Sequence, residues 1–315
     1  MDVVFIGTTR FGLRCLEAIA ALPQCRVVGA VAAPPEFPIS YRPDGVRNVL
    51  HADVPGFCEA RAIPCALLAA GMNEPALLER VRGWRPDAFL VAGWYHMVPR
   101  AWREIAPAYG LHASLLPDYS GGAPLVWAMI NGERETGITL FQLAGGIDDG
   151  PIVAQAATEI RPDDTIATLY ERIERLGVGL VEAELPRIAD GSAVPVAQDE
   201  SRRRIFPQRG PEDGLIDWAL PAARIRDFVR AQTRPYPGAF ARAGGATVTI
   251  WAVRIAPEAP APLAAGRFAC AGGRLFAGTG DGAIEVVDFA VDGEPADEEA
   301  FRARFGAAGR LGAAP

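Results

Sequence analysis

Short apolar runs alternate with amphipathic stretches through the first part of the chain. Three of these runs have the composition of buried strands, at residues 3–6, 26–32 and 87–93. The stretches between them predict helices, at residues 13–22, 53–62 and 74–83. Strands that alternate with helices in this way predict an α/β fold with a parallel, doubly wound, Rossmann-like sheet. The proline-rich segment from Pro34 to Pro43 is predicted to be a loop.

The same pattern continues for two more strands and one long helix. The strands are predicted at residues 137–143 and 151–157. Apolar side chains then lie mostly on one stripe from Ile166 to Leu185, which predicts an amphipathic helix with Asp164 as its N-terminal cap. Residues 189–210 change to small and polar side chains. We interpret them as a linker in which Arg202–Arg204 form a solvated run.

The last third of the chain has a different period. A helix is predicted at residues 222–230, and short strands separated by glycine-rich turns are predicted at 215–218, 247–254, 267–270, 274–276 and 283–289. Such short strands are typical of a small β-barrel. The Gly- and Ala-rich tail, 306–315, is expected to be disordered. We therefore expect a Rossmann-like domain at 1–190, a linker at 191–205 and a β-barrel domain at 206–315.

The composition is that of a globular protein, since half of the 315 residues are hydrophobic and 22% are charged. Five cysteines, an odd number without a CxxC pair, favour reduced thiols in a cytoplasm. No run approaches the ~20 apolar residues of a membrane helix, and Met1–Ile6 is better interpreted as a strand than as a signal peptide. We therefore expect a cytoplasmic protein. All 31 basic residues are Arg, which excludes lysine chemistry such as a Schiff base.

Two polar, glycine-rich loops carry the candidate chemistry. His112 lies in the loop at 110–124, and Asp148 lies in the loop at 144–151, after the predicted strand 137–143. Open α/β sheets bind ligands at the C-terminal ends of their strands, where these loops are expected. One His and one Asp at such an edge predict an acid–base pair. A metal site formed by His96, His112 and Asp148 is disfavoured, because no HxH, HExxH or cysteine cluster accompanies it.

Several motifs, in this order along the chain, resemble the folate-dependent formyltransferase family. They are Ile6-Gly-Thr8, His112-Ala-Ser-Leu-Leu-Pro117, Gly121-Gly-Ala-Pro124, Thr136-Gly-Ile-Thr139, Gly146-Ile-Asp-Asp-Gly-Pro-Ile152, the segment Arg209–Trp218 and Arg234-Pro-Tyr-Pro-Gly-Ala-Phe240. The resemblance covers almost the whole chain. The members with this two-domain layout include methionyl-tRNA formyltransferases and formyltransferases of UDP-4-amino-4-deoxy-L-arabinose.

This resemblance implies a Rossmann-like catalytic domain, an OB-like β-barrel domain, and 10-formyltetrahydrofolate as formyl donor without a metal. It also implies that His112 and Asp148 are catalytic. Asp148 would take the proton of the amine, directly or through water, and a charged His112 would stabilise the oxyanion. A slot for the pterin ring would be lined by Trp94 and Tyr95. The rest of the implied folate site is Ser114, Leu115, Leu116, Pro117, Gly145, Gly146 and Ile147.

Two positions depart from the family pattern. Gly110 stands where the family has a catalytic Asn, and Ser120 stands where it usually has Arg. Losing one oxyanion donor typically costs ~10²–10³ in rate, so another group must compensate or the reaction differs. Tyr95, His96 and Ser114 are candidates to donate, although we favour wall packing for Tyr95 and His96.

The charge of the chain favours a small acceptor. A tRNA would need cations for its phosphates, whereas this chain has a net charge of −7, and residues 33–48 carry only Arg42 and Arg47 against Glu36 and Asp44. We therefore predict transfer to a small primary amine, such as an amino sugar on a nucleotide. Methionyl-tRNA stays open because of the arginines at 202–204 and 209. A degenerate relative that binds folate or hydrolyses its formyl group stays open because of Gly110.

Overall fold

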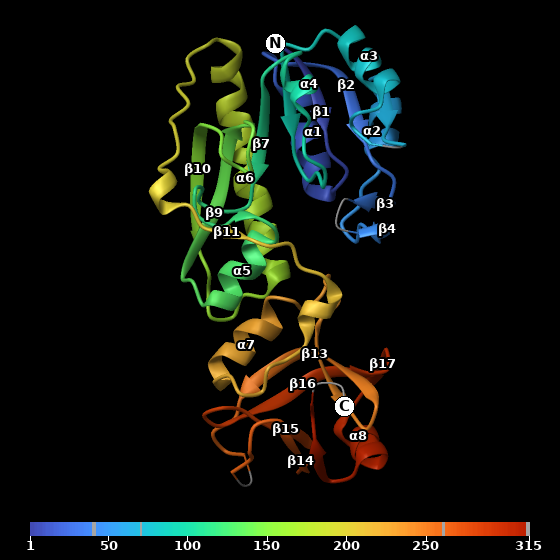
Figure 1. The fold of residues 1–315 in the computed structure, drawn as a ribbon, viewed down its shortest axis with the longest axis vertical. Coiled ribbons are helices and arrows are strands. Elements are labelled where there is room, and N and C mark those ends of the chain that lie inside the picture. Colours follow the sequence, from blue (N-terminus) through green and yellow to red (C-terminus); the bar gives the residue numbers. More distant parts are fainter. Residues whose placement is uncertain (40–41, 70, 260–261, 313–315) are drawn as a thin grey trace. The chain divides into compact units, whose positions relative to one another are not determined.

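The computed structural model describes residues 1–39, 42–69, 71–259 and 262–312 (Figure 1). The chain forms two compact units, each assembled from separate stretches. The first unit holds residues 1–121, 136–158 and 171–205, and the second holds residues 122–135, 159–170 and 206–315. Each unit takes segments from several parts of the chain. The contiguous domain bounds expected from the sequence stay a prediction.

The first unit is built on a seven-stranded sheet in the order β10-β9-β7-β6-β1-β2-β5 (Figure 1). Its strands are β1 (Asp2–Ile6), β2 (Arg26–Ala32), β5 (Cys65–Leu67), β6 (Ala88–Val91), β7 (Ala108–His112), β9 (Glu135–Gln142) and β10 (Ile152–Glu159). The strands from β7 to β5 are parallel, whereas β9 is antiparallel to β7. The predicted Rossmann-like fold is thus confirmed, with an antiparallel extension beyond β7.

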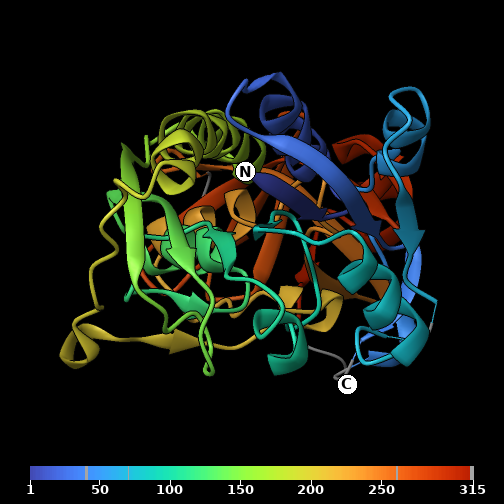
Figure 2. The ribbon, with the colours of Figure 1, turned by 90° about the horizontal axis from the view of Figure 1, so that it is seen from above.

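Helices cover both faces of this sheet because its central strands are apolar on both sides. Along β1, Val3 and Phe5 point to one face and Val4 and Ile6 to the other, as side chains alternate on a strand. The first face packs against α1 (Arg10–Ala21), α2 (Val54–Glu59) and α6 (Ile166–Ala189), of which α6 is the long yellow-green helix in Figure 2. The second face packs against α3 (Pro75–Gly83) and α4 (Arg100–Arg103).

The turn between β1 and α1 requires glycine. A Cβ atom at Gly7 would lie 2.2 Å from the carbonyl oxygen of Ala92, and one at Gly12 would lie 2.5 Å from the same oxygen. Thr9 caps α1 by accepting the amide hydrogen of Gly12. The turn therefore lies directly against the chain that leaves β6, at the C-terminal edge of the sheet.

The segment predicted as a proline-rich loop contains a hairpin instead. Its strands are β3 (Glu36–Ile39) and β4 (Arg42–Arg47), and Glu36 pairs with Arg47. Phe37 is buried in the core on the α3 side of the sheet, which anchors the hairpin. The prolines concealed this pattern, but a two-stranded ribbon has only edge strands, where proline is tolerated.

Two smaller predictions were also wrong. Asp164 does not cap α6: Thr165 Oγ1 accepts the amide of Thr168, whereas Asp164 accepts the Thr168 hydroxyl and the amide of Arg161. Asp164 therefore closes the preceding turn. Residues 215–218 form no strand, because only Leu215 makes a single bridge, to Phe240.

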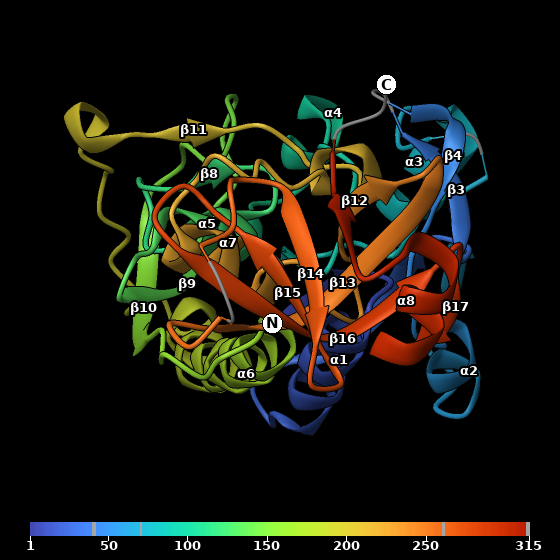
Figure 3. The same cartoon turned by 90° about the horizontal axis from the view of Figure 1, so that it is seen from below.

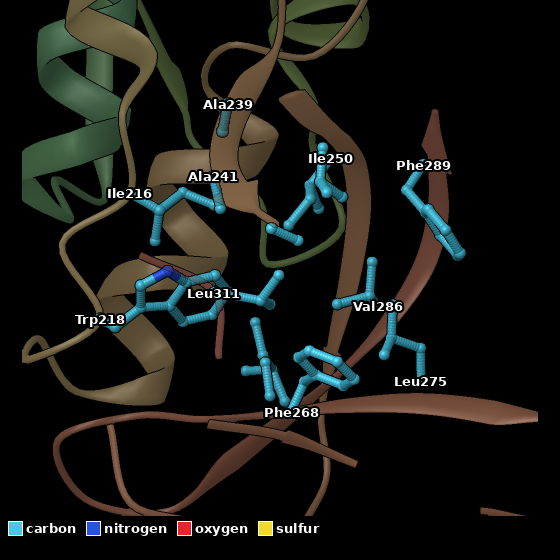
Figure 4. Close-up of a cluster of buried hydrophobic side chains, with 14 of the residues drawn as sticks. Ile216, Trp218, Ala239, Ala241, Ile250, Phe268, Leu275, Val286, Phe289 and Leu311 are labelled. Atoms are coloured by element: carbon cyan, nitrogen blue, oxygen red, sulfur yellow. The ribbon is translucent and has the colours of Figure 1, made fainter. Parts of the chain in front are cut away.

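The second unit is organised around an antiparallel sheet in the order β12-β13-β16-β15-β14-β18, with β17 beside β16 (Figure 3). These strands are β12 (Ala239–Ala243), β13 (Ala246–Ile255), β14 (Arg267–Ala271), β15 (Arg274–Gly278), β16 (Ala283–Val291), β17 (Glu294–Ala296) and β18 (Ala308–Arg310). The helices are α5 (Pro124–Asn131), η2 (Pro211–Gly214), α7 (Ala222–Arg230) and α8 (Glu298–Phe305). Trp218, Phe268 and Leu275 lie in its core (Figure 4). The predicted class, a barrel-like β-sheet, is confirmed.

The tail was predicted to be disordered, and for residues 306–312 this is wrong. Strand β18 pairs with β14, Leu311 is 1% exposed, and Gly312 bridges Arg242. Composition concealed this because most of the segment is Gly or Ala, and a single Leu makes the buried contact. Residues 313–315 lie outside the described ranges.

Candidate active site

His112 is the last residue of β7, where it pairs with Thr139 of β9. Its side chain is 11% exposed, and its Nε2 atom lies 2.8 Å from the carbonyl oxygen of Tyr119. Because a carbonyl can only accept, Nε2 must carry the hydrogen in this contact. The other ring nitrogen, Nδ1, is therefore the one that can gain or lose a proton without breaking this bond.

Asp148 faces that nitrogen from the turn after β9. Its Oδ2 atom lies 3.4 Å from Nδ1 of His112 and accepts the amide hydrogen of Gly121 at 2.8 Å. The backbone of Asp148 is left-handed, with φ of 51°. If the imidazole is neutral and the carboxylate charged, the Nδ1 lone pair faces Oδ2, and two acceptors oppose each other. A proton on either Nδ1 or Oδ2 turns this contact into a hydrogen bond. The structure thus brings together the two side chains that the sequence singled out, in an arrangement that can hold a proton.

The loop after His112 is fixed by internal hydrogen bonds. Ser114, which is 1% exposed, donates its hydroxyl to the carbonyl of Asp118. Thr139 Oγ1 donates to the carbonyl of Ser114 and accepts the amide of Leu116, and Gln155 donates to the carbonyl of Leu116. The hydroxyl of Ser114 is thus engaged by its own loop and is not positioned to replace the missing Asn. Leu116 and Pro117 are buried as well, and Leu115 is half-buried.

The turn that precedes Asp148 is open to solvent. Gly145, Gly146 and Ile147 are exposed, and the side chain of Asp149 holds the turn by accepting the amide of Gly146 at 3.0 Å. Apart from Gly145 and its two chain neighbours, no described residue has an atom within 4 Å of the place where a Cβ would stand at Gly145. These three residues leave room for a ligand, and their contact with folate stays a prediction.

The aromatic residues after β6 pack with the hairpin. The ring of Phe37 lies 5.4 Å from that of Tyr95 and 5.3 Å from that of His96, which is also 5.3 Å from the ring of Trp94. Tyr95 donates its hydroxyl to Asn48. His96 Nε2 is buried and has no hydrogen-bond partner among the residues that the structure describes, and burial lowers the pKa of His96. These contacts fit the wall packing that we favoured for Tyr95 and His96.

The position of the absent Asn is bordered by an apolar side chain. Gly110 pairs with Phe141, and a Cβ at residue 110 would lie 2.8 Å from Cδ2 of Leu143 and 3.3 Å from the Phe141 ring. The direction in which an Asn side chain would leave the strand is therefore filled by Leu143. Neither residue supplies the donor that an Asn would bring: Leu143 has no polar side-chain atom, and the hydroxyl of Ser114 donates to Asp118.

Of the linker arginines predicted to form a solvated run, Arg202 and Arg204 are exposed, and the prediction is wrong for Arg203. Arg203 is only 10% exposed and donates to Ser120 Oγ at 2.9 Å and to the carbonyl of Ile147 at 3.1 Å. Arg204 makes two hydrogen bonds to the carboxylate of Asp118. Sequence reasoning missed these contacts, although one signal was present: polar or acidic acceptors stand at 118 and 120, in the loop at 110–124.

A short ribbon joins the same two segments. Strand β8 (Ser120–Gly121) pairs with β11 (Ile205–Phe206), and the amide of Ser120 donates to the carbonyl of Arg204 at 3.0 Å. Because the chain enters this ribbon directly after Arg203 and Arg204, both side chains lie close enough to contact the loop at 110–124.

Across the described ranges, His, Cys, Asp and Glu side chains nowhere gather in groups of three that could hold a metal ion. In those same ranges no helix has both the length and the apolar character of a membrane span.

Family comparison assigns both parts of the chain. Residues 42–183 match the model of the formyl transferase family, and residues 209–304 match the model of the formyl transferase C-terminal domain. Together the two matches span most of the chain, in the order of the two predicted folds. The protein therefore belongs to the formyl transferase family.

Solved structures with the same fold include three distant proteins. HypX from Aquifex aeolicus in complex with tetrahydrofolic acid has a TM-score of 0.60 and 19% identity over 91% of this chain and 43% of that chain. The N-formyltransferase from Helicobacter canadensis in complex with folinic acid and dTDP-3-aminofucose has a TM-score of 0.64 and 17% identity over 90% and 98%. Methionyl-tRNA formyltransferase from Clostridium thermocellum has a TM-score of 0.54 and 18% identity over 81% and 93%. The chain spans less than half the length of HypX, and at these identities the likeness is one of fold.

Proposed function

We propose that the protein transfers a formyl group from 10-formyltetrahydrofolate to the primary amine of a small molecule, such as an amino sugar on a nucleotide. The contact between His112 Nδ1 and Asp148 Oδ2, at 3.4 Å in a member of the formyl transferase family, carries this proposal. The folate donor is supported by the tetrahydrofolic acid and folinic acid in two proteins of the same fold.

The proposed chemistry uses the pair as a proton carrier. The amine nitrogen bonds to the formyl carbon, and its proton passes to Asp148, directly or through water. Nδ1 of His112 shares that proton, while Nε2–H keeps its bond to Tyr119. When the bond between the formyl carbon and the folate nitrogen breaks, the proton is returned to that nitrogen. The charged imidazole also stabilises the oxyanion that forms between these two steps.

The charges beside the site support a small acceptor rather than a polyanion. Arg203 pairs with Glu200, and Arg204 pairs with Asp118, so the two linker cations that contact the loop at 110–124 are each matched by a carboxylate. A surface that binds tRNA instead presents cations to phosphates, which makes affinity strongly dependent on salt.

A panel of acceptors tests this proposal. Purified protein is incubated with 10-formyltetrahydrofolate and either dTDP- and UDP-linked amino sugars or initiator methionyl-tRNA, at about 50 and about 200 mM salt. We expect formylated amino sugar, formed at rates that change little with salt. Efficient formylation of the charged tRNA, lost at the higher salt, would contradict the proposed acceptor class.

A second candidate function is favoured by the contact of Gly110 with Leu143. With an apolar side chain where the family has an amide donor, the protein could bind formyl-folate and release the formyl group to water. Formate production that does not depend on any added amine would identify this hydrolase, and tight folate binding without turnover would identify a sensor.

A further inference from the structure

The guanidinium of Arg203 touches both loops that carry the candidate catalytic pair. Its Nη1 atom donates to Ser120 Oγ at 2.9 Å, to the carbonyl of Ile147 at 3.1 Å and, at 3.4 Å, to the carbonyl of Asp148. Ser120 directly precedes Gly121, whose amide binds the Asp148 carboxylate. Arg203 therefore spans the gap between the two loops beside the hydrogen bond from Gly121 to Asp148.

The guanidinium is itself held in place. Nε and Nη2 donate to the two carboxylate oxygens of Glu200 at 2.6 and 2.7 Å, and Nη2 also donates to Gln198 Oε1 at 3.2 Å. The hydrogen bond to Glu200 raises the pKa of Arg203, so the group stays charged. A planar, charged fork with several fixed partners holds geometry in a way that a flexible amine cannot.

Gln198 adds a second contact to the same turn. Its Nε2 atom donates to the carbonyl of Asp148 at 2.7 Å and to that of Gly150 at 2.6 Å. Asp148 has a left-handed backbone, a conformation that non-glycine residues keep only where their surroundings hold it. The linker residues 198 and 203 supply these restraints on the carbonyl side of Asp148.

We propose that Arg203 is a positioning residue for the formyl transfer inferred above: it holds the Asp148 turn against the Ser120–Gly121 strand and so sets the distance from Asp148 Oδ2 to His112 Nδ1. This deepens the proposed function and rests on it. The arginine that reaches Ser120 comes from the linker, 83 residues further along the chain.

The test compares Arg203→Met and Arg203→Lys with Arg202→Met, which removes a neighbouring exposed arginine. We expect Arg203→Met to lower kcat by about 10- to 100-fold, since a small misplacement of reacting groups costs up to about 10². KM for the folate donor should stay within about threefold, because positioning acts on the chemical step rather than on uniform binding. Arg203→Lys should lie between, since lysine keeps the charge but cannot bridge both loops.

A second readout does not depend on activity. The chain has three histidines, His51, His96 and His112, so their ring nitrogens can be assigned by NMR. Arg203→Met should move the Nδ1 signal of His112 and leave those of His51 and His96 unchanged, and Arg202→Met should move none. Unchanged His112 signals with unchanged kcat in both Arg203 variants would overturn the proposal. If the wild type formylates no acceptor and Arg203→Met still moves His112 alone, the positioning role stands and the proposed function fails.

Discussion

Leu143 occupies the space into which any side chain at Gly110 would extend, with its Cδ2 atom 2.8 Å from the Cβ position of residue 110. The two residues lie on neighbouring segments, at β7 and directly after β9. An apolar side chain, that of Leu143, therefore fills the place beside residue 110 that the side chain of the expected Asn would take. An amide cannot be restored there without moving Leu143.

The first prediction therefore uses a double variant. Gly110→Asn alone should leave activity low, because the new side chain collides with Leu143 and cannot adopt a low-energy rotamer. Gly110→Asn with Leu143→Ala should raise kcat about tenfold or more, since one oxyanion donor is worth ~10²–10³. Steady-state kinetics of both variants and of Leu143→Ala alone check this. If the double variant loses activity relative to Leu143→Ala, the site has been rebuilt around Gly110.

His112→Ala and Asp148→Asn should each lower kcat by ~10²–10⁴, the usual contribution of a positioned acid or base. Asp149→Asn is the matched control, because Asp149 lies beside Asp148 but its carboxylate accepts the amide of Gly146, which an Asn oxygen can also do. The control should stay near the wild-type rate, and circular dichroism should show all three variants folded. Near-normal turnover in either test variant would remove that residue from the mechanism.

His96 predicts how stability depends on pH. Burial lowers the pKa of His96 in the folded protein, so the unfolded chain binds the extra proton first. The free energy of unfolding should therefore be unaffected by His96 above its ordinary pKa of ~6.5 and should fall as the pH drops below it.

His96→Phe removes this dependence. It also removes a buried nitrogen that has no partner within the described part of the chain, an arrangement that costs ~1–3 kcal/mol. Urea unfolding at several pH values between about 8 and about 5.5 checks the prediction. The gain of the variant over the wild type should grow toward acid pH. A gain that shrinks toward acid pH would show that His96 is charged in the folded protein.

Leu311→Ala tests the ordered tail. Leu311 is 1% exposed within the core of the second unit, and deleting such a side chain costs ~2–5 kcal/mol. Arg310→Ala, at an exposed neighbouring position, should change stability by less than ~0.5 kcal/mol. Denaturant midpoints compare the two. Equal midpoints would mean that the tail does not contribute to the core.

The sequence predicted the regions where local patterns decide the structure. Val3–Ile6 and the run around Phe89 had to be buried strands. The pairing of His112 with Asp148 was also expected, but the single sheet edge assumed for it was wrong. Strand β9 is antiparallel to β7, so the end of β9 at Gln142 lies beside Tyr109, and the following turn brings Asp148 to His112. Arg203 could not be placed in this way. Its partners Ser120 and Ile147 are 83 and 56 residues away along the chain. The period of hydrophobic and polar residues predicts local helices and strands, and it does not predict a contact between residues so far apart.

Helix α6 has a consequence for engineering this protein. Its residues up to Tyr170 belong to the second unit, and its residues from Glu171 belong to the first, while residues 122–135 also belong to the second. A cut at residue 205 would therefore leave the C-terminal piece without two of its own segments. Exchanging that piece between relatives as a cassette would need residues 122–135 and 159–170 to travel with it.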